Sequence, residues 1–104
     1  MKPLVISDPA RIEFREITIW YRERDERVAA RFTAEARRVL ALIERLPQIG
    51  SRVSGVEDSS VREISMRKFP YRIVFADLGD RIDVVAFAHK HRGPEYFAER
   101  LRGL

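Results

Sequence analysis

The sequence predicts an α+β fold in which a helical hairpin packs on a small antiparallel sheet. In the first half, apolar residues recur at helical spacing over two consecutive stretches. In the second half, three short segments alternate or run apolar, and Gly79-Asp80 is a tight-turn signal between the last two. With a short N-terminal strand and a short C-terminal helix, residues 1–104 are expected to form a single domain, because 104 residues support one modest core.

The first half supplies the strand and the hairpin. Residues 3–7, PLVIS, predict a short strand, after which Asp8 is a candidate N-cap and Pro9 takes the favoured first helical position. The first helix is expected to end near Arg24, with an inward face made by Ala10, Phe14, Ile17 and Tyr21. The second is expected to start near Glu26 and to end before Pro47, with a stripe made by Val28, Phe32, Ala36, Val39, Ile43 and Leu46.

The second half is expected to begin with an exposed loop, residues 47–60, that is rich in Gly, Ser and Asp. Strands are predicted over 61–67, 71–78 and 81–88. A final short helix begins at Gly93-Pro94, and its shared face carries Phe97, Leu101 and Leu104.

The turn at Gly79-Asp80 predicts a strand register. A two-residue turn places Phe75 opposite Val84, and stepping back pairs Ile73 with Ala86 and Tyr71 with Ala88 on the core face. Arg72 then pairs with Phe87 on the other face, and His89 points to that same side. This register therefore predicts that Arg72 and His89 emerge together on a functional surface away from the core.

The charge balance suggests an anionic partner. The chain has a net charge of +4, with 17 arginines against 3 lysines. Arginine makes forked contacts with phosphate and carboxylate groups. Along both helices arginine alternates with glutamate, as on a solvated face, so we look for uncompensated charge elsewhere. It lies at Arg62, Arg67, Lys68 and Lys90, which are candidate partner-binding residues.

Composition excludes several classes of site. The chain has no cysteine, and two histidines alone cannot build a zinc site, so no metal and no cofactor is predicted. No stretch approaches the roughly 18 apolar residues of a membrane span, and the N-terminal residues do not resemble a signal peptide. A cytoplasmic location without membrane contact is therefore expected.

The whole chain resembles the small toxins of the RelE/ParE superfamily of bacterial toxin–antitoxin modules. The resemblance is carried by WYRER, ALIERLPQIGSRV, VREISMRKFPYRIVF and VVAFAHKHRGPEYFAERL, in this order and in a chain of this length. The pattern RKFPYRIVF followed by AHKHR and PEYF is most similar to ParE-type toxins.

The resemblance implies two alternative activities. ParE-type toxins inhibit DNA gyrase by binding, whereas RelE-type toxins are metal-free ribonucleases that cut mRNA on the ribosome. Arg72 and Arg92 match the two arginines of the RelE-type site, and Tyr96 lies near the place of its aromatic residue. Where that site has lysines, this sequence has Glu63 and Ser65, and an acid there repels phosphate. The resemblance therefore favours a gyrase inhibitor that is not an enzyme.

The ribonuclease alternative has its own candidate catalytic residues. Cleaving RNA without a metal needs a base, an acid and fixed cations. His89 or His91 could be the base or the acid, Arg72 and Arg92 could bind phosphate, and Tyr96 could stack on a base or donate a proton. Each also has a structural interpretation, such as a salt bridge for Arg72 and packing for Tyr96.

A protein partner is also implied. Trp20 beside Ile19 widens the apolar surface of the first helix, which either marks an interaction site or packs on the sheet. Toxins of this resemblance are neutralised by a cognate antitoxin whose acidic C-terminal segment folds on binding. For the gyrase contact, the strand face and the C-terminal segment are the candidates. A third alternative is a non-toxic basic domain that holds nucleic acid in a salt-dependent way.

Overall fold

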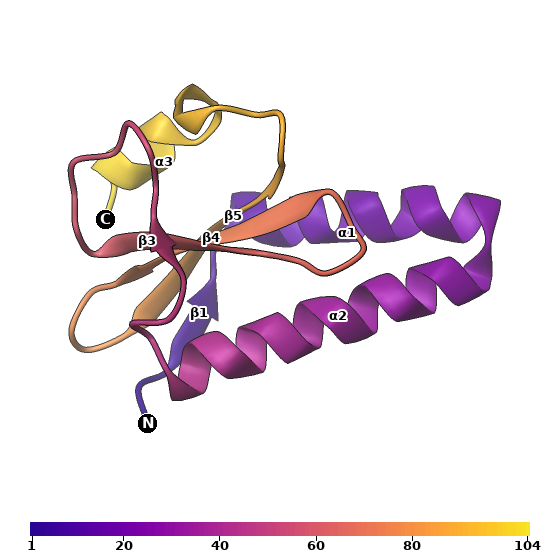
Figure 1. Cartoon of the computed structure of the whole chain (residues 1–104), viewed down its shortest axis with the longest axis horizontal. Helices are drawn as coiled ribbons and strands as arrows, with labels where there is room; N and C mark the ends of the chain where they lie inside the picture. Colours follow the sequence, from indigo (N-terminus) through magenta and orange to yellow (C-terminus); the bar gives the residue numbers. More distant parts are fainter.

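The computed structural model describes all residues, 1–104, and has the predicted order of elements. The helical hairpin consists of α1 (Asp8–Arg24) and α2 (Glu26–Arg45) and extends past the sheet (Figure 1). The strands are β1 (Leu4–Ile6), β2 (Ser51–Arg52), β3 (Val61–Ser65), β4 (Tyr71–Asp77) and β5 (Ile82–His89). A 3-10 turn, η1 (Pro94–Tyr96), leads into α3 (Ala98–Arg102). The predicted α+β class is confirmed.

The two helices form for the reasons that the sequence indicated, with one correction at the first cap. Ser7, not Asp8, is the N-cap of α1, because its side chain accepts from the Ala10 N–H while Asp8 already lies in the first turn. Asp25 ends α1 and caps α2. The inward stripe of α2 is buried or half-buried except at Leu46, which lies beyond the helix and is 54% exposed.

We predicted an antiparallel sheet, but the sheet is mixed. Its strand order is β1-β5-β4-β3-β2, and β1 pairs with β5 in parallel. The helical hairpin connects β1, at one edge of the sheet, to β2, at the other edge. The predicted exposed loop, 47–60, also contains β2, which extends the sheet beside β3, and Val53, which is buried.

Two hydrophobic clusters lie on opposite faces of the sheet. The first joins the helical hairpin to one face, with Phe32, Ile43 and Phe75 among its fully buried residues. The second joins the other face to the C-terminal segment through Phe97. The face away from the helices, on which we expected a functional surface with Arg72 and His89, is therefore a second core covered by η1 and α3.

The predicted register is correct from the turn as far as Phe75 and Val84, and a β-bulge in β5 makes it wrong beyond that pair. Phe75 does lie opposite Val84, but Val74 then pairs with Ala86, so Val85 is an extra residue. Val85 and Ala86 consequently both pack in the second cluster. The extra residue shifts every later pair by one position, and because strand side chains alternate with period two, the later β5 side chains point to the opposite face from the one predicted.

The shift separates Arg72 from His89. Arg72 pairs with Ala88 on the C-terminal side of the sheet, whereas His89 pairs with Tyr71 on the helical side. The predicted common face for Arg72 and His89 is therefore wrong, and the two side chains do not form a shared functional surface.

Candidate functional site

Arg72 is buried and holds the turn that follows β5. Its guanidinium donates to the carbonyl oxygen of His89 at 3.0 Å and to that of Arg92 at 2.7 Å. Its Nε lies 2.9 Å from Oε2 of Glu63, an ion pair whose N–H does not point at the oxygen. Only 9% of Arg72 is exposed. The side chain is thus engaged with the protein's own carbonyls and not presented to a ligand.

The other three candidate catalytic residues meet in one cavity. His89, Arg92 and Tyr96 line a hollow of about 520 Å³, together with Tyr71, Phe87 and His91. The guanidinium carbon of Arg92 lies 4.8 Å from the centre of the Tyr96 ring, and the rings of His89 and His91 stack with centroids 5.1 Å apart. No acidic residue lines this cavity, so it suits an anionic or aromatic ligand.

The turn after β5 determines which ring nitrogen of neutral His89 carries the proton. The backbone N–H of His91 donates to Nδ1 of His89 at 3.2 Å, so in the neutral ring the proton lies on Nε2. Burial, and then His91, Lys90 and Arg92, hold the pKa of His89 below its ordinary value. His89 is therefore a neutral imidazole near neutral pH, with its proton on Nε2.

The Tyr96 hydroxyl is hydrogen-bonded to Glu13, a residue that was not among the candidates from the sequence. Its hydroxyl donates to Oε2 of Glu13, which also accepts from Arg100 at 2.9 Å. Oε1 of Glu13 accepts from Arg100 at 3.0 Å and from the Phe87 N–H at 3.1 Å. Burial, and then Glu13, raise the pKa of the Tyr96 hydroxyl. Tyr96 is in consequence a poor proton donor to any ligand.

This Glu13 network joins α1, β5, η1 and α3. It also explains the bulge, because β1 pairs with β5 only as far as Val84 and leaves the next backbone groups of β5 without a strand. Glu13 satisfies the Phe87 N–H there, and Arg100 donates to the Val85 carbonyl at 3.1 Å. A signal was present in the sequence, since Glu13 lies on the inward stripe of α1 between Ala10 and Ile17.

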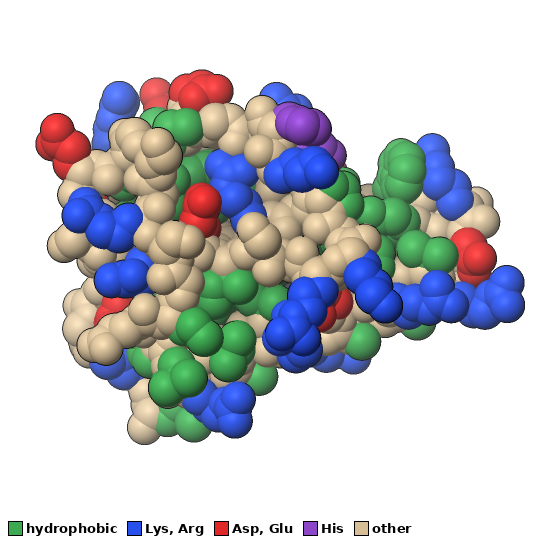
Figure 2. All heavy atoms as spheres, in the orientation of Figure 1, with side chains coloured by type: hydrophobic (Ala, Val, Ile, Leu, Met, Phe, Trp, Pro, Cys, Tyr) green, Lys and Arg blue, Asp and Glu red, His purple; other side chains and the backbone are tan.

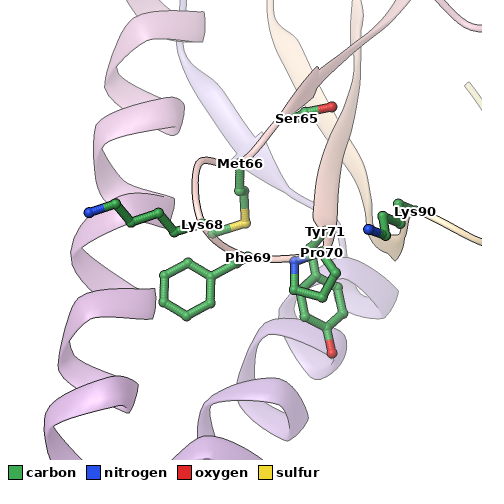
Figure 3. Close-up of a pocket in the computed structure, with 7 residues that line it drawn as sticks. All are labelled: Ser65, Met66, Lys68, Phe69, Pro70, Tyr71 and Lys90. Carbon is green, nitrogen blue, oxygen red and sulfur yellow. The ribbon is translucent and has the colours of Figure 1, made fainter.

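The predicted partner-binding cations spread over two hollows beside the loop between β3 and β4. Lys68 and Lys90 line one of about 430 Å³, drawn in Figure 3, whose wall also includes Tyr71. Arg67 and Lys68 line another of about 610 Å³ against α2. Arg62 points elsewhere and donates to the Gly50 carbonyl at 3.2 Å.

Trp20 lies on α1, apart from these cations. Half of the residue is exposed. Of the two interpretations given above, packing on the sheet is therefore wrong for Trp20. The guanidinium of Arg24 stacks 3.6 Å from the centre of that ring. Ile12 and Ile19 are also exposed on α1. The helix therefore presents apolar side chains outward, as an interaction surface does.

The structure has neither a group of metal ligands nor a membrane-spanning helix. No three His, Asp or Glu side chains are grouped so that they could hold a metal ion. None of the helices combines the length and the apolar composition that crossing a bilayer requires.

Comparison with known proteins gives a family and a fold. A family described as "ParE toxin of type II toxin-antitoxin system, parDE" matches residues 4–94. A solved structure titled "Chromosomal ParDE TA system from P. aeruginosa" is similar, with a TM-score of 0.71 and 16% sequence identity over 86% of this chain and 96% of that chain. At this identity the similarity shows a shared fold alone. A search of curated proteins finds no match.

Proposed function

Because the chain belongs to the ParE toxin family of type II toxin–antitoxin systems, we propose that it inhibits DNA gyrase by binding and that a cognate antitoxin neutralises it. The family match over residues 4–94 is the observation that carries this proposal. Inhibition by binding also agrees with the state of Arg72, whose guanidinium is occupied by backbone carbonyls and so is withheld from phosphate.

The antitoxin part of the proposal is supported by two surfaces. Exposed Ile12, Ile19 and Trp20 offer apolar contacts on α1, and Lys68 and Lys90, which form no ion pair, offer positive charge in the hollow of about 430 Å³. A segment that folds on binding needs apolar surface to offset its ordering entropy, and acidic residues in it would meet the cations. Trp20→Ala is expected to weaken antitoxin binding by about tenfold to a hundredfold, since exposed aromatic anchors dominate such interfaces.

The experiment is controlled expression of the gene alone and then with its neighbouring antitoxin gene. DNA synthesis and protein synthesis are followed separately by labelled precursors. The proposal predicts that DNA synthesis stops first, that cells become filamentous with an induced DNA-damage response, and that the antitoxin restores growth. Harmless expression would favour a non-toxic basic domain instead.

A ribosome-dependent ribonuclease is the second candidate, and one observation favours it. His89, Arg92 and Tyr96 line a single cavity of about 520 Å³, and no Asp or Glu side chain lines it. Against it, Glu13 holds the Tyr96 hydroxyl and the Arg72 guanidinium is not free. The same expression experiment separates the two, because a ribonuclease stops protein synthesis, cleaves messages and is silenced by Arg92→Ala.

A further inference from the structure

The solvent face of α2 carries a straight row of arginines, which we call the arginine stripe. It consists of Arg27, Arg31, Arg38 and Arg45, spaced four or seven residues apart, so that all lie on one side of the helix. All four residues are exposed. At a rise of about 1.5 Å per residue, the stripe is about 27 Å long.

Most of this charge is not neutralised within the protein. Arg31 and Arg45 form no ion pair, and Nε of Arg27 reaches Asp25 only at 3.5 Å. Arg38 is the exception, since it binds Glu35 at 2.8 Å and thereby lowers the pKa of that carboxyl. The gaps in the row are filled by small residues and not by glutamates. The solvated face of alternating charges that we expected along both helices is therefore not found on this side of α2.

The loop between β3 and β4 adds two more cations to the same side. Arg67 and Lys68 line a hollow of about 610 Å³ together with Arg31 and Arg38. Glu35 fixes this loop by accepting from the Arg67 N–H at 2.6 Å. Lys68 has φ of 67°, a conformation uncommon for a non-glycine residue. Figure 2 shows Lys and Arg side chains gathered over α2, with few acidic side chains among them.

We infer that the arginine stripe binds the phosphate backbone of duplex DNA. Duplex DNA carries about one charge per 1.7 Å of axis with both strands counted, so a row about 27 Å long spans a length of duplex with about 16 phosphates, of which those on the near side face the row. The gaps between the arginines are filled by Ala34 and Ala41, which are both exposed, so the helix can approach a flat polyanion closely. This contact goes beyond gyrase inhibition and does not depend on it.

The surroundings of the stripe favour a duplex over the other polyanions. Single-stranded nucleic acid is usually held by aromatic side chains that stack on bases, and the row itself has none. Phe69, the aromatic residue of the adjoining hollow, packs edge-on against the rings of Tyr21 and Phe32 within the protein. An acidic peptide that folds on binding needs apolar contacts, and the exposed large apolar side chains of the hairpin, Ile12, Ile19 and Trp20, belong to α1. A rigid backbone of evenly spaced phosphates needs only the row of guanidinium groups.

The test measures binding of the full-length protein to a fluorescent 20-base-pair DNA duplex by anisotropy, as a function of salt. The variant Arg27→Gln/Arg31→Gln/Arg45→Gln removes three unpaired or weakly paired cations and leaves Arg38 with Glu35 intact. The matched control, Arg11→Gln/Arg15→Gln/Arg22→Gln, removes the same charge from exposed positions of α1. A third variant places lysine at the three α2 positions. Circular dichroism confirms that each variant is folded.

The α2 glutamine variant should bind about tenfold more weakly at physiological salt, and its salt slope should fall by about 3. The α1 control and the lysine variant should stay within about threefold of the parent protein. Equal loss in the α1 control would overturn the inference, because net charge alone would then explain binding. Tighter binding to a single strand of the same length, or displacement of the duplex by a lower concentration of poly-glutamate, would also overturn it.

Discussion

Glu13→Gln removes the one negative charge at the junction of α1, β5 and the C-terminal segment. Glu13 is 9% exposed, and its carboxylate accepts four hydrogen bonds, two from Arg100 and one each from Tyr96 and the Phe87 N–H. Glutamine keeps one acceptor oxygen but places an amide donor where the second oxygen was. The Tyr96 hydroxyl can turn to accept from that amide, whereas Arg100 cannot accept at all.

The magnitude follows from the burial of the pair. Breaking a buried ion pair by removing one partner costs about 3–5 kcal/mol. Because the Arg100 side chain is still 22% exposed and can be hydrated in part, we expect a loss in unfolding free energy of about 2–3 kcal/mol. For a domain of this size that lowers Tm by on the order of 10 °C.

Urea unfolding followed by circular dichroism measures this loss. Glu16→Gln, an exposed carboxylate on the same helix, is the matched control and should change stability by less than about 0.5 kcal/mol. In a double-mutant cycle with Arg100→Met, Glu13 and Arg100 should show a coupling energy of about 2 kcal/mol. A Glu13→Gln variant as stable as the parent, or strictly additive losses in the cycle, would refute the proposed role of the network.

Three further predictions concern stability. Arg72→Met should lower the unfolding free energy by about 2–4 kcal/mol, because it leaves Glu63 and two backbone carbonyls unpaired, and amide exchange in the turn after β5 should become faster; unchanged exchange would contradict this role. Since burial lowers the folded-state pKa of His89, its contribution to stability is present above a pH of about 6.5 and is lost as the pH falls, so His89→Gln should flatten stability measured between pH 7 and 5. Gly50→Ala should cost about 1–3 kcal/mol in thermal unfolding, because φ is 90° and the new Cβ would lie 2.5 Å from the Glu63 carbonyl oxygen, whereas Gly103→Ala should be near neutral.

Elements whose packing follows from local periodicity could be predicted from the sequence. The inward stripe of α2, from Phe32 to Ile43, is buried as its spacing indicated, and the turn at Gly79-Asp80 forms with Gly79 at φ of 93°. Both depend on residues that are neighbours along the chain or along one helix.

Features that depend on contacts between distant segments could not be predicted in this way. The bulge at Val85 is supported by Glu13 and Arg100, which lie 72 residues earlier and 15 residues later, and neither is visible from the alternation of β5. The same extra residue reversed the side to which His89 points. Arg72 lies on the predicted side of the sheet, but the C-terminal segment covers it through the Arg92 carbonyl and the Phe97 ring. Three of the four candidate catalytic residues, His89, Arg92 and Tyr96, nevertheless share a cavity, and their function stays a prediction.

The central claim is that this ParE-family chain acts on DNA gyrase by binding, and a supercoiling assay tests it most directly. Purified full-length protein is added to gyrase and relaxed plasmid, with and without the purified product of the neighbouring antitoxin gene. We predict that supercoiling is inhibited and that the antitoxin restores it. Gyrase that remains fully active, together with mRNA cleavage on purified ribosomes by the same preparation, would contradict the claim.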